Sequence, residues 1–457
     1  MNKRMQTFQT TAELLTIYTA LTVLIFTAAG CSGSLRSTAP LSSEQASPSQ
    51  DLSQPWSTPD PEDMLLPEGL KDFDNFGTSL AYDDNLLAVG APNTDLEGTR
   101  NVGAVYLFQK SGIAWQQIAR LTPDPPQPDS RFGSALAFDG EVLAVGAPYE
   151  YNPGAGNASG AVYLFTRNKG GWTQEVRLSA EGGSPFDLFG SALALSGRDL
   201  AVGGRAVDGP NGERDAGAVY LYRRDDRDWA LQTRLGAEAD PFDHFGHALA
   251  FAGDELFIGA PDTDLSQNSN AGQVYVYQKM REDWMEQGQL NGDEVRPQAR
   301  FGAALNVQGD LLAVVAPQEY QKPGPMPPNA FAYEAGWGAA HIFERSGGHW
   351  QWQARLFPEP ADEQYAMWVN NAVIITSRGQ ARLALSGFGR GGIIPFIQQD
   401  GTWQAMPELV LPEMNLIDGQ ALAVANGQIL LGSGFYDIPG PGGNALQSAG
   451  VVWLIDW

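Results

Sequence analysis

The chain has 457 residues and a formal net charge of −25 at neutral pH, and so acidic a surface disfavours nucleic acid and anionic lipid as partners. Its single Cys excludes an intramolecular disulfide, so stability must come from the core. A chain of this length commonly holds two or three domains, but an internal repeat overrides that expectation.

The first 30 residues predict a secretory signal peptide. Two basic residues, Lys3 and Arg4, precede an apolar run that ends in small residues just before the single cysteine, Cys31. Residues 31–61 are rich in Ser, Pro and Gln with few apolar side chains, which is typical of a disordered tether.

Residues 76–457 carry one motif seven times. Each copy holds a segment such as LAVGAP, a polar Gly-rich stretch, a segment such as GAVYLF and then a Trp. A sixth copy, near 366–403, and a seventh, near 418–455, are eroded but keep this order. A fixed period of this length indicates a repeat architecture. The five clear copies open with a Phe-Gly pair, 56 or 57 residues apart, at Phe76, Phe132, Phe189, Phe245 and Phe301.

Four short apolar segments recur in each copy, bounded by Gly, Pro, Asn and Asp, and this pattern predicts strands. Tight turns such as Asp139-Gly140 join the first two segments. Each copy is therefore predicted to be a four-stranded antiparallel meander. We predict an all-β chain in which residues 62–457 form a seven-bladed β-propeller.

The last copy ends at Trp457 with its fourth strand missing. In other copies the Leu of that strand lies 11 residues before the next Phe-Gly pair, and the same count back from Phe76 reaches Leu65. We therefore predict that residues 60–67 supply a strand that completes the last blade and joins the two chain ends.

The combination of Phe-Gly, LAVGAP and GAVYLF resembles the FG-GAP repeat of integrin α-subunits and of bacterial secreted and surface proteins. The resemblance covers residues 76–457 and implies a propeller that serves as a ligand-binding or scaffolding module. The small residues before Cys31 resemble a bacterial lipoprotein signal, which implies that Cys31 carries a lipid. An uncleaved membrane anchor with an incidental Cys is the alternative, and both place the propeller outside the cytoplasm.

The Ca²⁺-binding DxDxDG loops of integrin-like repeats are absent, because tight turns stand in their place. The resemblance therefore predicts no cofactor and no metal site, although acidic loops containing Asp95 or Asp262 leave calcium open as an alternative. Four His residues, among them His244, His247 and His341, are scattered over different copies, which disfavours a His-ligated metal.

The connections from the second to the third strand, and from one blade to the next, are long and variable, so we expect the face that they share to bind a partner. The fifth copy has the longest connection, residues 318–337, and aromatic residues with Met are enriched at interface cores. The alternative is a plug over the end of the propeller. The predicted partner-binding residues are Tyr320, Met326, Phe331, Tyr333 and Trp337.

The repeated Trp residues occupy one position of the motif, so we expect them to be packing residues: Trp115, Trp172, Trp229, Trp284, Trp350 and Trp403. No linear catalytic motif stands outside the repeat. The sequence therefore predicts a lipid-anchored module of the cell envelope that is not an enzyme and that binds a protein or glycan. A hydrolase or lyase with an axial site, and an adhesive spacer without a ligand, are the alternatives.

Overall fold

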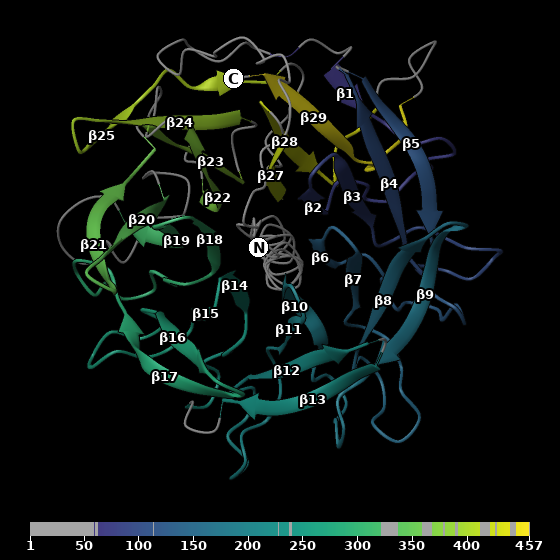
Figure 1. Ribbon diagram of the computed structural model, residues 1–457, viewed down its shortest axis with the longest axis horizontal. Helices are drawn as coiled ribbons and strands as arrows, with labels where there is room; N and C mark the ends of the chain where they lie inside the picture. The colour runs from purple at the N-terminus through teal and green to yellow at the C-terminus, as the bar shows by residue number, and fades with distance from the viewer. Residues whose placement is uncertain are drawn as a thin grey trace, which may run out of the picture.

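The structure, a computed structural model, describes residue 59 and residues 63–456, apart from 113, 227, 237–239, 321–336, 359–367, 378–379, 389–391, 412–420, 426 and 439–444. The described residues form antiparallel sheets arranged as seven blades around a central axis (Figure 1). The predicted all-β, seven-bladed propeller is therefore confirmed. The signal peptide, Cys31 and most of the predicted tether lie outside the described residues and stay predictions.

The first four blades each consist of four consecutive strands. Blade 1 holds β2 (Ser79–Asp83), β3 (Leu86–Ala91), β4 (Ala104–Ser111) and β5 (Ala114–Leu121). Blade 2 holds β6 (Ala135–Asp139), β7 (Val142–Ala147), β8 (Ala161–Asn168) and β9 (Gly171–Leu178). Blade 3 holds β10 (Phe189–Ser196), β11 (Asp199–Gly204), β12 (Ala218–Asp225) and β13 (Asp228–Leu235). Blade 4 holds β14 (Ala248–Ala252), β15 (Glu255–Ala260), β16 (Gln273–Met280) and β17 (Asp283–Leu290).

The last three blades depart further from the repeat. Blade 5 holds β18 (Ala304–Gln308), β19 (Leu311–Tyr320), β20 (Trp337–Ser346) and β21 (His349–Leu356). Blade 6 holds β22 (Trp368–Ser377), β23 (Gln380–Phe388), β24 (Gly392–Gln399) and a fourth strand in two pieces, β25 (Thr402–Ala405) and β26 (Leu409–Val410). Blade 7 holds β27 (Ala421–Ala425), β28 (Gln428–Ser433), β29 (Val451–Asp456) and β1 (Met64–Leu65).

Burial changes across a blade from the axis outward. The second strand, such as β3, is buried at every residue, because sheets cover both of its faces. The fourth strand, such as β5, alternates between exposed and half-buried residues, as an outer edge strand does. The first strands of successive blades lie beside one another around the axis (Figure 1). Apolar layers between neighbouring blades form the core, and the layer of blades 1 and 2 contains Val105 and Leu143.

The repeated Phe-Gly pair joins neighbouring blades. Phe132, which opens blade 2, is fully buried and forms a parallel bridge with Gly103 of blade 1. Gly103 has a φ of 90°, and a Cβ on it would lie 2.0 Å from the Phe132 carbonyl oxygen. Only Gly permits both this backbone conformation and this approach. These Phe side chains are thus wedged between blades.

The N-terminal strand closes the ring as predicted. Met64 pairs with Trp453 and Leu65 with Val452, so β1 is the fourth strand of the blade made by the C-terminus (Figure 1). The Leu65 side chain is buried between this blade and blade 1. Both ends of the described chain are therefore held in one sheet.

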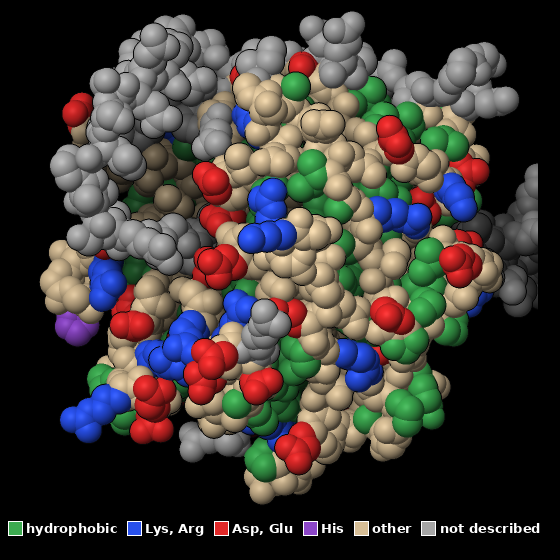
Figure 2. Space-filling model, turned by 45° about the vertical axis from the view of Figure 1, so that its right-hand side comes forward, with side chains coloured by type: hydrophobic (Ala, Val, Ile, Leu, Met, Phe, Trp, Pro, Cys, Tyr) green, Lys and Arg blue, Asp and Glu red, His purple; other side chains and the backbone are tan. Residues whose placement is uncertain are grey.

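The repeated Trp residues pack at the outer ends of the inter-blade layers, as predicted. Trp172 lies against Phe138 with ring centroids 5.7 Å apart, and all six are partly buried against core clusters. On the face shown in Figure 2, acidic and basic side chains are interspersed despite the large net charge. Among the described residues, none forms a helix of the length and apolarity needed to cross a bilayer.

Candidate functional site

The long connections share one end of the propeller, which we call the loop face. Within the described residues, five of the connections between blades hydrogen-bond to the loop between the second and third strands of the preceding blade. The backbone N–H of Asp129 donates to the carbonyl of Arg100 at 2.9 Å, and that of Phe186 donates to Asn157 at the same distance. The short turns lie at the opposite end, which we call the hairpin face. The predicted grouping of the long connections is therefore confirmed.

The predicted contact residues of the fifth-blade loop lie mostly outside the described part of the chain, namely Met326, Phe331 and Tyr333. The backbones of Tyr320 and Trp337 pair with each other where β19 and β20 enter that loop. Their assignment to partner binding stays a prediction, and so does the alternative of a plug.

Exposed aromatic residues lie on the loop face that were not predicted from the sequence. Phe73, Phe186 and Phe242 occupy one repeat position, three residues before the Phe-Gly pair, and are 56%, 62% and 48% exposed. Tyr151, in the loop between the second and third strands of blade 2, is 49% exposed. Large exposed aromatic side chains on one face are typical of a contact surface.

These three Phe residues also have an unfavourable backbone. Their φ angles are 64°, 70° and 70°, in the left-handed region that bulky residues rarely adopt. The hydrogen bond from each Phe N–H to the preceding blade's loop holds that conformation. Local strain kept by the surrounding structure is often found at functional positions.

A second group of variable residues surrounds the axis on the loop face. The residue before each Phe-Gly pair again has a positive φ, between 53° and 58°, yet its side chain varies among four residue types: Asn75, Arg131, Leu188, His244 and Arg300. Because the first strand is the innermost, these residues lie at its entrance beside the axis. At this position the backbone conformation is the same in the five clear copies, whereas the chemical type of the side chain changes.

We call six of the residues at this entrance the axial rim: Arg131, Tyr149, Arg205, His244, Asp262 and Arg300. The Asp262 carboxylate lies 2.7 Å from the ring Nδ1 of His244 and accepts a hydrogen bond of 2.8 Å from Arg300. The Arg131 guanidinium lies 4.7 Å from the centre of the Tyr149 ring. Asp262 thus links two blades, and Arg131 makes a cation–π contact.

Electrostatic shifts show that the rim residues of different blades influence one another. Burial, and then the charge of Arg300, lower the pKa of Arg205, while Tyr149 and Asp262 oppose this. Blades 3 and 5 are not neighbours, but Arg205 follows a second strand and Arg300 precedes a first strand, so both lie at the loop-face entrance beside the axis. Burial would raise the pKa of Asp262, but His244 and Arg300 outweigh it and lower the pKa.

His247 directly precedes the first strand of blade 4, which begins at Ala248, and it is buried. Burial lowers the pKa of His247 well below its usual value, and the charges of Arg205 and Arg300 add to this. Its neutral ring lies where the other copies place a small residue such as Ser134.

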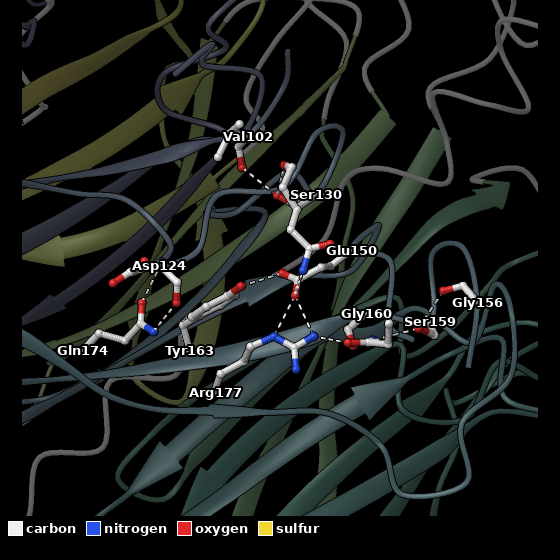
Figure 3. Close-up of polar contacts among 12 residues, drawn as sticks. Val102, Asp124, Ser130, Glu150, Gly156, Ser159, Gly160, Tyr163, Gln174 and Arg177 are labelled. Atoms are coloured by element: carbon white, nitrogen blue, oxygen red, sulfur yellow. Dashed lines mark hydrogen bonds and ion pairs between the residues drawn. The ribbon is translucent and has the colours of Figure 1, made fainter. Parts of the chain in front are cut away.

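Another polar cluster lies between blades, away from the rim, and Figure 3 shows it in blade 2. The buried Glu150 carboxylate accepts hydrogen bonds from the Tyr163 hydroxyl at 2.8 Å and from Arg177 at 2.7 Å (Figure 3). Burial raises the pKa of Glu150, and the charge of Arg177 partly offsets that rise. Tyr163 and Arg177 face each other on β8 and β9.

Blade 5 carries the same cluster with a histidine in place of the tyrosine. His341 Nε2 lies 2.6 Å from Glu319, whose carboxylate also accepts a hydrogen bond of 3.2 Å from Arg355. This resembles a catalytic pair, but both side chains are almost fully buried and the adjoining space is only about 10 Å³. That volume scarcely holds one water, so the His341 pair belongs to the core.

The carboxylate of this cluster comes from one of two positions. Blades 1 and 3 place Asp74 and Asp187 two residues before the Phe-Gly pair, and the charges of Arg120 and Arg234 act on them. Blade 2 has Ser130 at that position and supplies Glu150 instead. Blade 5 follows blade 2, with Ala299 and Glu319. The arginine of the fourth strand in each of these four blades thus has one buried carboxylate nearby. Because the same pairing recurs from blade to blade, the cluster is structural.

Two open grooves lie on the hairpin face, where no site is predicted. One, of about 610 Å³, lies between blades 2 and 3 and is lined by Glu141, Glu175 and Arg224, among others. The other, of about 590 Å³, lies between blades 5 and 6 and includes Glu344 and Gln398. Their linings are polar, and Glu175 already pairs with Arg224 at 3.4 Å.

Acidic and histidine side chains do not cluster as metal ligands do. Within the described ranges, no three His, Cys, Asp or Glu residues lie close enough together to hold a metal ion. Asp95 and Asp264, which the sequence left open as calcium ligands, accept hydrogen bonds from the backbone of their own loops at 2.9 and 2.8 Å. Both carboxylates are therefore engaged in loop structure.

The axial rim was not predicted from the sequence. Its members stand at repeat positions, and repeat positions suggested packing. The sequence signal for this site was the disagreement between copies, above all Arg205 in VGGR, where the other four clear copies read VGAP, IGAP or VVAP. Asp262 and His244 were considered singly, whereas the fold brings them together.

The fold and the loop face define the class of protein. It is a repeat propeller whose strands are alike from blade to blade and whose loop-face residues differ. The family model of the FG-GAP repeat matches residues 62–108, 115–165, 172–222 and 229–277. The matched repeats are FG-GAP repeats, and the chain folds as a seven-bladed β-propeller, a fold consistent with a protein-binding module.

The similar curated proteins are integrin alpha chains. Integrin alpha-M of Mus musculus is 23% identical over 299 residues, which are 61% of this chain and 24% of that protein. Integrin alpha-E of Mus musculus is 30% identical over 166 residues, 33% of this chain and 13% of that protein. The chain thus spans a quarter or less of the length of these relatives.

Among solved structures, a putative 6-phosphogluconolactonase from Bacteroides uniformis superposes with a TM-score of 0.50 at 12% identity. The match covers 76% of this chain and 89% of that one. It corrects the prediction that the chain is not an enzyme. That prediction rested on the absence of a linear catalytic motif, whereas a propeller can gather a site from several blades. The likeness itself shows a shared fold alone.

Proposed function

We propose that the chain is an extracytoplasmic module, lipid-anchored at Cys31, whose loop face binds a protein or glycan partner in the cell envelope. The observation that carries this proposal is the set of strained, exposed aromatic residues on that face, Phe73, Phe186 and Phe242. The fold class and the sequence of residues 1–61 support the binding role and the anchor.

The aromatic set favours binding over packing, because its members gain little from the fold beyond the contact of the Phe242 ring with the Arg214 guanidinium, which lies 5.7 Å from the ring centre. They are about half exposed, and their backbone would suit Asn or Gly better. Blade 2 places Asp129 at the same position, which pairs with the exposed Arg100 at 2.9 Å, so the fold does not need an aromatic residue there. Exposed Phe and Tyr supply large contact area when a partner covers them.

A triple variant tests the binding surface, with Phe73→Asn, Phe186→Asn and Phe242→Asn. We expect unchanged or slightly increased thermal stability, since Asn tolerates a positive φ. Crosslinked complexes recovered from native envelopes with the wild-type chain should be lost with this variant.

A matched control carries Ile118→Asn, Leu231→Asn and Met285→Asn, three exposed apolar residues on outer strands. It should keep the complexes. Retention of the same complexes by the Phe variant, at wild-type yield, would refute the assignment of the loop face. Shortening residues 323–333 tests the fifth-blade loop separately, and unchanged complexes would remove that loop from the surface.

A second candidate is catalysis at the axial rim, as in the alternative of a hydrolase or lyase. It is favoured by the 2.7 Å pairing of His244 with Asp262, since a carboxylate can orient an imidazole for proton transfer. His244→Asn keeps the backbone conformation, because Asn75 holds it in blade 1. Hydrolysis of a panel of esters and lactones that fell with this variant would support catalysis, and equal rates would count against it.

A further inference from the structure

We propose that the axial rim is a binding site for a small molecule that carries an oxyanion, a carboxylate or a phosphate group, held by Arg131, Arg205 and Arg300. This site goes beyond the proposed partner surface, since it needs none of the exposed Phe residues. The rim is basic, with three guanidinium groups and the carboxylate of Asp262, on a chain whose net charge is −25.

The three arginines converge from different blades. Arg205 follows the second strand of blade 3 and Arg300 precedes the first strand of blade 5, so both lie at the loop-face entrance beside the axis, where the charge of Arg300 acts on Arg205. Arg131 reaches Tyr149, which in turn is a hydrogen-bond partner of Arg205. All three are half-buried, so they keep access to solvent while lying near one another.

Gathering like charges is unfavourable unless something offsets their repulsion. Burial lowers the pKa of Arg205, and the positive charge of Arg300 adds to this effect. Asp262 offsets part of it by pairing with Arg300 at 2.8 Å, and it orients that side chain at the same time. An arriving oxyanion would offset the rest through bidentate hydrogen bonds, for which the planar guanidinium fork is suited.

The repeat itself argues against an accidental cluster. Arg205 stands where four other copies carry Pro92, Pro148, Pro261 and Pro317. Arg131 and Arg300 hold left-handed backbone at φ 53° and 58°, a conformation that Asn75 fills more favourably in blade 1. One departure from the motif, in blade 3, and two residues at a variable position, in blades 2 and 5, therefore bring the same functional group to one place.

Calorimetric titration of the full chain with inorganic phosphate and with citrate, at constant ionic strength, tests the site. We expect saturable binding of at least one probe. Arg205→Pro, which restores the motif of the other copies, should weaken it by about tenfold to a hundredfold, the effect of losing charge-assisted hydrogen bonds. Arg300→Asn provides a second variant in case the first unfolds, and its fold is checked by thermal melting.

The matched control is Arg198→Gln, which removes one positive charge beside a hairpin-face turn and should leave probe binding unchanged. Binding of neither probe by the wild-type chain would overturn the proposal, and so would equal weakening by Arg205→Pro and Arg198→Gln. The triple Phe variant should bind the probes normally, so failure of the partner surface and failure of this site are distinguishable.

Discussion

At the scale of single residues, the repeat provides its own comparison, because each side chain can be set against its counterparts in other blades. The buried carboxylate near the arginine of the fourth strand illustrates this. It comes from Asp74 or Asp187 in two blades and from Glu150 or Glu319 in two others. A buried cation left without an anion is costly, so the two positions are expected to compensate for each other.

Moving the carboxylate within blade 2 tests this compensation. Glu150→Thr should lower the free energy of unfolding by about 3 kcal/mol, because Arg177 loses its buried partner. Adding Ser130→Asp, which reproduces the arrangement of blade 1, should recover most of the loss, as measured by denaturant melts. Ser130→Asp alone, the control, should not stabilise the chain, since it adds a second buried carboxylate. A double variant no more stable than Glu150→Thr would contradict the idea.

Asp243 should make stability depend on pH. Blade 4 has Gln289 where other blades carry the arginine, and burial raises the pKa of Asp243 to about 6. The folded chain therefore binds a proton between about pH 4 and 6 that the unfolded chain has released. Stability should fall as pH rises through that window, by about 3 kcal/mol, and then level off.

Asp243→Asn should remove this dependence and raise the melting temperature at pH 8, because Asn can still accept the hydrogen bond from the Asp240 N–H. Asp187→Asn is the matched comparison and should not stabilise, since it takes an anion away from Arg234. A melting temperature at pH 8 that drops for Asp243→Asn would show that the carboxylate is ionised and paired.

At the scale of the element, the strands could be predicted because each carries its own pattern. Burial on both faces produces the apolar run of β7, and one exposed face produces the alternation of β5. The axial rim could not be predicted in this way, because its residues come from several elements in different blades. Tyr149 and Arg205 follow second strands while Arg131 precedes a first strand, and only the ring geometry brings them together.

The junction between two blades depends on a glycine that no other residue can replace. Gly160 has a φ of 86°, and a Cβ there would lie 2.1 Å from the carbonyl oxygen of Phe189. Gly160→Ala should therefore push blades 2 and 3 apart and cost well over the ~1 kcal/mol of an ordinary Gly→Ala change at positive φ. Melting temperatures of the two purified proteins measure the difference.

Gly182→Ala is the matched control, because Gly182 also has a positive φ, 71°, but faces open space. The fall in melting temperature caused by Gly182→Ala should reflect the backbone conformation alone. Equal falls in melting temperature for Gly160→Ala and Gly182→Ala would mean that the close approach between blades contributes nothing to stability.

At the scale of the whole molecule, stability depends on closing the ring. The described strands of blades 1 to 5 are each completed within one stretch of chain, whereas blade 7 takes its outer strand from the other end. The closing contact is short, only Met64 and Leu65 paired with Trp453 and Val452. It nevertheless covers the edge of β29 and buries Leu65 against blade 1.

Deleting residues 60–67 should therefore lower the melting temperature sharply. The loss includes the burial of Leu65, about 2–5 kcal/mol for a large apolar side chain, together with the pairing of β29. The uncovered edge should also favour association, because an unpaired strand edge accepts strands from other chains. Thermal melting and light scattering measure the two effects.

Deleting an equal length of the predicted tether, residues 40–47, is the control and should leave both measurements unchanged. A synthetic peptide of residues 60–72 added to the chain lacking 60–67 should restore part of the melting temperature, because it can pair with β29 without being covalently joined. Closure by the N-terminal strand would be refuted by a deletion variant that melts at the wild-type temperature and remains monomeric. Partial recovery by the peptide, in contrast, would show that the ring is held by strand pairing rather than by the covalent path of the chain.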